Sequence, residues 1–374
     1  MKAFITGSTG FLGSHLVEAL LKKDFSIKCL VRNSEKLKRL IPNIVENRNI
    51  EIVCGDCCDK KSLELAITPD IDYVFHLAGL VRAVHSDDLY LTNVRGTKNL
   101  VDVVFEKNPG VKRFVYISSQ AASGPSQEGR VQVGLSLGCN DDHGCHCEEA
   151  RRKSGRRGNL DINANTEITS PQAKKTEDKI ANPVSHYGFS KFLGELEVQK
   201  YKEKLPIAIL RPPSIYGPRD KDIFVFFEYA KKGFLPIPSD EKFINISYVS
   251  DIVDGIILSA LSEKAKGQTY FIGDDKVFSW NDLCEILKKV VNPKTSIIKI
   301  PYFIFWISAF FSEIFARLKN KPALISFDKL NEMKQKSWLF SSAKARFDFD
   351  YASKVSLEEG IKITHNWYKK EGWL

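Results

Sequence analysis

The sequence lacks an apolar run long enough to cross a lipid bilayer. A helix that spans the hydrocarbon core needs about 20 consecutive apolar residues. The most apolar stretch, 302–316, is shorter and contains Ser308, Ser312 and Glu313. We expect this aromatic-rich stretch to form a helix that packs on its own domain or on a second copy of the chain. Two alternatives stay open for it, the lip of a substrate channel or a helix on a membrane surface.

The sequence also lacks the cysteine patterns of a disulfide framework and of a zinc site. Its eight cysteines are scattered, and several fall in segments expected to be buried, which indicates reduced thiols. Cys145 and Cys147 are separated by one residue, whereas zinc knuckles use two to four, and no second pair follows. We therefore predict no metal. Because the first strand is expected to begin at Lys2, no signal peptide is expected, and the predicted location is cytoplasmic.

Large apolar residues are sparse between 127 and 179, a segment rich in glycine and in polar and charged residues. Such a composition cannot bury enough surface to order itself, so we predict a disordered insertion over 127–179. Five units of the formal charge of +9 come from the run 151–157 inside it. That run has no interleaved aromatic residues, which argues against nucleic-acid binding. We expect a small-molecule substrate and no nucleic-acid partner.

A glycine-rich turn opens the chain at 6–13, with the sequence TGSTGFLG. It follows a short apolar strand at 2–6 and precedes a segment, 11–23, whose apolar residues recur with the helical period. A strand, glycine turn and helix in this order hold a dinucleotide pyrophosphate on the N–H groups of the helix N-terminus. The alternative is an ordinary strand-to-helix turn. We predict cofactor contacts at Gly7, Thr9, Gly10, Phe11, Leu12 and Gly13.

The second expected strand, 26–31, ends without the acidic residue that usually binds the adenosine ribose. Arg32 follows instead, and its guanidinium is a bidentate partner for a 2′-phosphate. We therefore predict that the cofactor is NADP in preference to NAD. Lys36 and Arg39 follow about one helical turn on and fit a solvated basic helix face better than the same pocket.

Two further short apolar strands, 51–54 and 73–77, end in small or acidic residues. Parallel strands buried on both faces have this composition, and their carboxyl ends line the cofactor crevice of a doubly wound sheet. The alternative for each of these residues, considered alone, is that it only forms the turn after its strand. The predicted cofactor contacts here are Asp56, Cys57, Leu77, Ala78 and Gly79.

Ser119, Tyr187 and Lys191 have the side chains of a carbonyl proton donor. Another buried strand, 114–117, leads into Ser118 and Ser119, while Tyr187 and Lys191 are one helical turn apart and share a helix face. A phenol titrates at about pH 10, and a nearby ammonium with the positive ring of an oxidised nicotinamide lowers that pKa. Tyr187 then serves as acid or base, with Ser119 bonded to the same substrate oxygen. A tyrosine and a lysine at this spacing are common in helices. The interpretation therefore depends on their occurrence together with Ser119 and the glycine turn.

Taken together, these motifs resemble the extended short-chain dehydrogenases/reductases of the epimerase, dehydratase, dihydroflavonol-reductase and 3-beta-hydroxysteroid-dehydrogenase group. The resemblance extends over most of the chain and also rests on the segments 55–56, 76–79, 93–100, 211–219 and 248–252. It implies an α/β fold, a Rossmann doubly wound parallel sheet with a smaller C-terminal substrate-binding domain. The first domain is expected over 1–211 with a return at 246–270, and the second over 212–245 and 271–374.

The resemblance also implies roles for single residues. Ser119 rather than Ser118 is the catalytic serine, because it stands five positions before Gly124, the glycine that closes this family segment. Asn93 resembles the structural asparagine near the site and joins Ser119, Tyr187 and Lys191 in the catalytic set. Pro212 resembles the residue at the nicotinamide end, where Tyr187 and Lys191 also contact the cofactor. By their positions in the family pattern, the resemblance implies that Tyr216, Arg219 and Asn245 contact the substrate.

Two departures from the family pattern narrow the chemistry. Sugar-nucleotide dehydratases carry an Asp-Glu pair after the catalytic serine or threonine, whereas this chain has Gln120-Ala121. The strand end at Arg32 is closer to NADP-using reductases than to epimerases. We predict a reductase or dehydrogenase acting on a ketone or secondary alcohol, and a homodimer like many relatives. The alternatives are a nucleotide-sugar epimerase that retains NAD and, from another class, a non-catalytic NAD(P)-binding scaffold or sensor.

Overall fold

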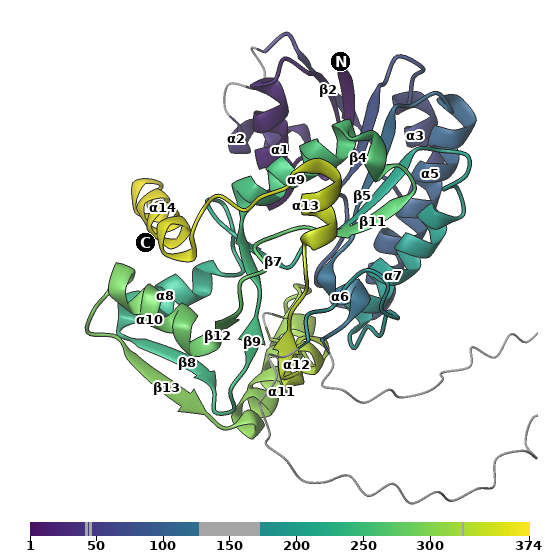
Figure 1. The fold of residues 1–374 in the computed structure, drawn as a ribbon. Helices are drawn as coiled ribbons and strands as arrows, with labels where there is room; N and C mark the ends of the chain where they lie inside the picture. Colours follow the sequence, from purple (N-terminus) through teal and green to yellow (C-terminus); the bar gives the residue numbers. More distant parts are fainter. Residues whose placement is uncertain (42–43, 45–46, 127–172, 324) are drawn as a thin grey trace, which may run out of the picture.

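A seven-stranded sheet forms the centre of the computed structural model, which describes residues 1–41, 44, 47–126, 173–323 and 325–374 (Figure 1). All its neighbouring strands are parallel and lie in the order β11-β6-β5-β4-β1-β2-β3. The strands are β1 (Lys2–Thr6), β2 (Ser26–Val31), β3 (Ile50–Cys54), β4 (Tyr73–His76), β5 (Arg113–Ile117), β6 (Ile207–Arg211) and β11 (Gln268–Phe271). The chain runs outward from β1 to β3 and then returns to β4 on the other side of β1, which creates a switch point between β1 and β4. The predicted Rossmann fold is confirmed.

Helices cover both faces of this sheet because the strands are apolar on both sides. Every residue of β4, β5 and β6 is buried. Helices α3, α5 and α7 pack side by side on one face, and α1 and α9 pack together on the other (Figure 1). The helices of this part are α1 (Phe11–Leu21), α2 (Ser34–Leu40), α3 (Lys60–Ala66), α4 (Ser86–Tyr90), the π-helix Leu91–Arg95, α5 (Gly96–Lys107), α6 (Gln120–Ser123), α7 (His186–Gln199), α9 (Val249–Leu261), the 3₁₀-helix Glu263–Ala265 and α13 (Ala343–Phe349).

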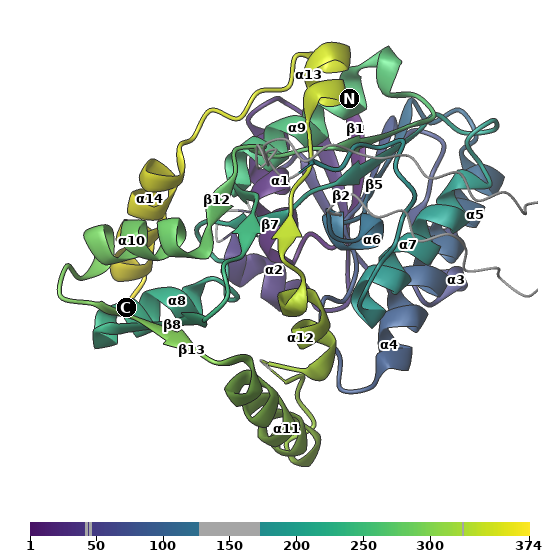
Figure 2. The same cartoon turned by 60° about the horizontal axis from the view of Figure 1, so that its bottom comes forward.

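The remaining elements lie beyond the carboxyl ends of the central strands (Figures 1 and 2). Small sheets pair β8 with β13, β7 with β10, and β9 with both β12 and β14. Their strands are β7 (Ser214–Tyr216), β8 (Phe234–Pro238), β9 (Phe243–Ile244), β10 (Ile246–Tyr248), β12 (Phe278–Ser279), β13 (Ser296–Ile300) and β14 (Ser337–Trp338). Their helices are α8 (Phe224–Lys232), α10 (Trp280–Val291), α11 (Tyr302–Leu318), α12 (Phe327–Lys334) and α14 (Leu357–Lys370). The segments predicted to form the smaller domain supply nearly all of these elements.

Most of the predicted insertion, residues 127–172, lies outside the described residues, as do Cys145, Cys147 and the basic run 151–157. Its final stretch, 173–179, is bonded to the rest of the protein. The Lys175 backbone N–H donates to Leu339 O at 3.0 Å, and the Glu177 carboxylate accepts from the Phe271 backbone N–H at 2.8 Å. These bonds fix where the chain enters the loop that leads to α7.

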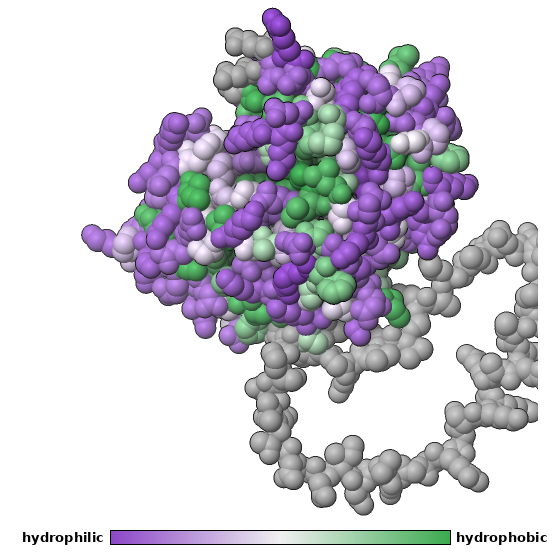
Figure 3. Space-filling model, turned by 45° about the horizontal axis from the view of Figure 1, so that its top comes forward, coloured by the Kyte–Doolittle hydropathy of each residue, from purple (hydrophilic) through white to green (hydrophobic). Residues whose placement is uncertain are grey.

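Hydrophilic side chains cover most of the face drawn in Figure 3, and apolar side chains gather towards its centre. Within the ranges described above, no helix combines the length and the apolar character needed to cross a membrane. Helix α11 projects from the body of the molecule (Figure 2).

Candidate active site

A cavity of about 1390 Å³ runs from the glycine turn to the small sheets. Its wall contains residues from β1–α1, from the ends of β4, β5 and β6, from α7, and from α8, α10, α11 and α12. The predicted cofactor and catalytic residues in the wall are Gly7, Thr9, Gly10, Phe11, Leu12, Gly13, Leu77, Gly79, Ser119, Tyr187, Lys191 and Pro212. The structure therefore brings together residues that are up to about two hundred positions apart in the sequence.

The glycine turn has the geometry of an anion cradle. Gly7 has φ +76°, and a Cβ there would lie 2.6 Å from the Ala78 backbone nitrogen. A Cβ on Gly13 would lie 2.2 Å from Gly7 O, so neither position accepts a side chain. Gly10 is the N-cap of α1 and has no side-chain cap, which leaves N–H groups of the first turn available to a phosphate. The turn fits a dinucleotide pyrophosphate.

The predicted adenosine contacts lie around this end of the cavity, but Arg32, Asp56, Cys57 and Ala78 are outside its wall. The Arg32 guanidinium is exposed and lies 4.0 Å from the Asp56 carboxylate. Cys57 is buried. Lys36 does line the cavity together with Leu40, because α2 starts directly after β2 and residues four apart share a helix face. The Lys36 side chain is exposed, as predicted, and the helix face that carries it also borders the cavity.

Ser119, Tyr187 and Lys191 come from two elements on either side of the cavity floor. Ser119 is the N-cap of α6, and its Oγ accepts from the Ala121 backbone N–H at 3.1 Å. Tyr187 and Lys191 lie on the first turns of α7. The Lys191 ammonium is buried, donates to Ile117 O at 2.6 Å and lies 4.4 Å from the centre of the Tyr116 ring. The lysine is thus fixed at the end of β5, beside the serine.

Burial sets the pKa values of this pair. Desolvation raises the pKa of Tyr187 to about 12; a hydrogen bond with Ser119 opposes the rise, and the Glu332 and Asp222 carboxylates add to it. Desolvation lowers the pKa of Lys191 to about 7, partly opposed by Glu195. The sequence predicted a lowered phenol pKa from the ammonium and the oxidised cofactor. In the protein without a cofactor, burial is the largest influence on the phenol pKa, so Tyr187 holds its proton.

Asn93 is a positioning residue rather than part of the cavity wall. It is fully buried in the π-helix, a form that often marks functional segments. Its amide donates to Leu80 O and to Ser190 Oγ at 2.9 and 2.8 Å, and its Oδ1 accepts from the Leu80 N–H at 2.8 Å. It therefore ties the loop after β4 to the helix that carries Tyr187.

Two acidic residues of α12 hold the start of α7, and sequence reasoning missed both. The Asp328 carboxylate accepts from the backbone N–H groups of His186 and Tyr187 at 2.6 and 3.3 Å. Glu332 accepts from the hydroxyl of Ser185, the N-cap of α7, at 2.7 Å. Negative charge at a helix N-terminus is favourable. No spacing in the sequence marks these residues, because they meet α7 only through the tertiary fold.

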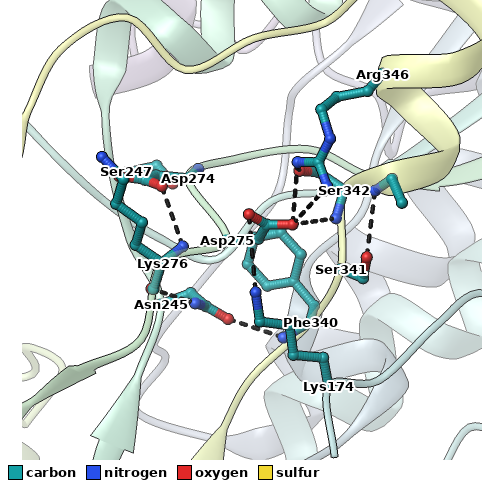
Figure 4. A network of polar contacts seen from close by, with 11 residues as sticks. Lys174, Asn245, Ser247, Asp274, Asp275, Lys276, Phe340, Ser341, Ser342 and Arg346 are labelled. Atoms are coloured by element: carbon teal, nitrogen blue, oxygen red, sulfur yellow. Dashed lines mark hydrogen bonds and ion pairs between the residues drawn. The ribbon is translucent and has the colours of Figure 1, made fainter.

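The predicted substrate contacts have different surroundings. Arg219 lines the cavity and donates to Ser14 Oγ and to the Glu18 carboxylate at 3.0 and 2.5 Å. Asn245 also lines it, but its amide donates to Lys276 O and accepts from the Phe340 N–H, so both ends are bonded (Figure 4). Tyr216 lies outside the wall. Its ring is buried in the core and its hydroxyl donates to Leu357 O at 3.3 Å, which is a packing position.

Two buried polar groups in the cavity wall have no bond partner among the described residues. They are the hydroxyl of Ser118 and the amide nitrogen of Gln120. Buried polar groups are normally bonded, and these two belong to residues that line the cavity. Gln120 has an uncharged amide at the position where the sugar-nucleotide dehydratases of the family that the sequence resembles have an acidic residue.

The parallel sheet, the glycine cradle at its switch point and the serine, tyrosine and lysine in one cavity define an NAD(P)-binding oxidoreductase of the extended short-chain dehydrogenase/reductase class. The protein is an enzyme of this class, as the sequence predicted. Residues 5–250 match the NAD-binding family described as "Male sterility protein", and the chain belongs to that family.

Relatives of known activity align over nearly the whole chain. Ceramide reductase of Caulobacter vibrioides is 23% identical, with 99% of this chain and 95% of that protein aligned. Mouse sterol-4-alpha-carboxylate 3-dehydrogenase, decarboxylating, is 25% identical, with 97% and 90% aligned. The solved structure of UDP-glucuronic acid 4-epimerase from Bacillus cereus with NAD superposes with a TM-score of 0.69 at 20% identity, covering 99% of each chain. The last comparison supports the fold alone.

Proposed function

We propose that the protein transfers a hydride reversibly between NADP(H) and a ketone or secondary alcohol, with Ser119, Tyr187 and Lys191 as its catalytic residues. The observation that carries this proposal is that these three side chains and the glycine cradle belong to the wall of one cavity. A nicotinamide dinucleotide supplies or accepts the hydride when it is bound. The protein's own groups must then handle the substrate oxygen and its proton.

Tyr187 is the proton donor in the direction of reduction. Its pKa of about 12 keeps the phenol protonated at neutral pH, so its proton is available to the carbonyl oxygen as the carbonyl carbon gains the hydride. Ser119 donates to the same oxygen and holds it. The phenolate left behind is stabilised by Lys191 when that amine is protonated, and it regains a proton from water. Oxidation of the alcohol runs through the same groups in reverse.

The preference for NADP rests on Arg32 and Lys36, two cations at the adenosine end. The carboxylate usual at this strand end is absent, and Lys36 lies in the cavity wall. We expect Arg32→Ala with Lys36→Ala to raise the KM for NADPH at least about tenfold and to leave that for NADH nearly unchanged. Arg39→Ala, outside the wall, is the matched control. Equal changes for both cofactors contradict the preference.

The activity is tested with Tyr187→Phe, assayed by NADPH oxidation on a panel of ketones. Loss of the proton donor should lower turnover by about 10²- to 10⁴-fold while NADPH affinity stays within about twofold. Tyr229→Phe is the control, because Tyr229 lines the same cavity. A Tyr187→Phe enzyme with the wild-type rate overturns the assignment. NAD released from the purified protein on denaturation favours the epimerase instead, and NADPH binding without turnover of any carbonyl favours the scaffold.

A further inference from the structure

Helix α11 presents a broad apolar face to the outside of the molecule. Its large side chains are exposed along the whole helix, among them Phe303, Ile307, Phe310, Phe311, Phe315 and Leu318. A helix that is apolar on every side is normally buried. A continuous exposed apolar surface of this kind marks an interaction site.

The opposite side of α11 packs against α12. Phe305 and Ala309 are buried against Leu330 of α12, and the Tyr302 hydroxyl donates to Leu330 O at 2.5 Å. The Glu313 carboxylate accepts from the Phe327 N–H at 2.9 Å, where α12 begins. Helix α11 is therefore anchored through one face and projects from the body with the other (Figure 2).

The charges around α11 favour a lipid surface over a second copy of the chain. Between Ser296 and Phe327 the only acid is Glu313, whereas Lys299, Arg317, Lys319 and Lys321 are basic and exposed. Cations flanking an apolar helix are attracted to anionic headgroups. A twofold dimer through this face would place the same patch against itself and bring these cations together.

The same helix forms part of the cavity wall. Ile304, Phe305 and Ala316 line the cavity, which continues towards Phe226, Phe234 and Trp280 of the small sheets and their helices. The cavity thus extends from α11 to the site of Tyr187, and its wall also contains charged side chains, among them Asp222, Asp328 and Glu332. A lining that combines apolar and charged side chains suits a molecule with both a hydrocarbon part and a polar group.

We propose that α11 lies in the surface of an anionic membrane and that the cavity behind it takes a membrane-resident lipid carrying the ketone or secondary alcohol. The substrate class rests on the proposed function, but the docking of α11 does not. At 17 residues the helix lies on the bilayer rather than across it, with its aromatic residues among the headgroups and upper acyl chains.

Flotation with vesicles tests the docking. The probes are vesicles of equal parts phosphatidylcholine and phosphatidylglycerol, and vesicles of phosphatidylcholine alone. We expect the full chain to float with the mixed vesicles and at least about tenfold less with the neutral ones. Phe311→Glu with Phe315→Glu should reduce partitioning by at least about tenfold, because two apolar contacts are replaced by charges that anionic lipid repels. Phe347→Glu, at an exposed phenylalanine of α13, is the matched control and should float like the wild type.

Several outcomes overturn the docking: no flotation of the wild type, equal loss for Phe347→Glu, or a dimer in sedimentation that Phe311→Glu with Phe315→Glu dissociates.

The lipid substrate is tested by turnover. Turnover of a long-chain ketone in vesicles should fall in the variant with Phe311→Glu and Phe315→Glu, while turnover of a short-chain ketone in water stays unchanged. Equal falls for both ketones contradict the lipid substrate. Tyr187→Phe should float normally. A wild-type protein that floats but reduces neither ketone contradicts the proposed activity and leaves the docking supported.

Discussion

The Asp328 carboxylate accepts a hydrogen bond from the backbone N–H of Tyr187, a residue that precedes it by 141 positions. It accepts a second one from His186 N–H. The first turn of the helix that carries the proton donor is therefore held by a different helix, α12. The position of the phenol depends on an element that lies outside the central sheet.

Replacing Asp328 with alanine should misplace Tyr187 without removing it. We expect turnover to fall about 10- to 100-fold, because small displacements of a catalytic group are costly, while NADPH affinity stays unchanged. Asp328→Asn keeps an acceptor and should restore most of the rate. Asn331→Ala, exposed on the same helix, is the control in the same NADPH assay. A wild-type rate in Asp328→Ala contradicts the positioning role.

Lys191 should make the protein more stable as the pH rises. Its pKa is about 7 in the folded protein because of burial, against 10.5 for an ordinary lysine. Between these values the unfolded chain holds a proton that the folded one has lost, so the free energy of unfolding increases with pH, on the order of 1 kcal/mol per unit. Lys191→Met should remove this slope. Urea denaturation of both proteins between pH 7 and 10 measures it, and parallel curves would show that Lys191 does not cause the slope.

Gly13→Ala should abolish dinucleotide binding. The new Cβ would lie 2.2 Å from Gly7 O, so α1 must move away from the turn. Gly110→Ala is the matched control, since nothing lies within 4 Å of a Cβ there. Fluorescence titration with NADPH measures both variants, with circular dichroism to follow folding. Unchanged NADPH affinity in a folded Gly13→Ala protein means that the turn does not hold the pyrophosphate.

Glu195→Gln should destabilise the fold strongly. Both oxygens of the buried Glu195 carboxylate accept from the Arg211 guanidinium, at 2.9 and 2.7 Å. Removing one charge leaves the other buried and unpaired, at a cost of about 3–5 kcal/mol. Glu197→Gln breaks a pair with Lys200, whose side chain is 61% exposed at the end of the same helix, and should cost about 1 kcal/mol or less. Chemical denaturation distinguishes them, and equal losses would contradict the argument.

Local patterns predicted the sheet and the floor of the cavity. The strands at Lys2–Thr6 and Ser26–Val31 have the predicted bounds, and the β5 strand differs from the prediction only by its first residue, Arg113. Ser119, Tyr187 and Lys191 lie in one cavity because each belongs to a short motif attached to a parallel strand or its neighbouring helix. Such motifs are visible in sequence since their spacing is fixed by the helix or strand itself.

Contacts made only by the tertiary fold could not be predicted. Asp328 and Glu332 approach α7 from a distant segment, and no periodicity relates them to Tyr187. Tyr216 shares a motif with its neighbours, yet its ring is turned into the core. The sequence shows the lysine beside Tyr187 but not the depth of burial, which is the largest influence on the phenol pKa in the protein without a cofactor.

Helix α12 contacts α11 along one side and holds the start of α7 on the other. The two helices are therefore attached to opposite sides of one short helix, and a substitution that loosens α12 is expected to disturb both the projecting helix and the position of the phenol.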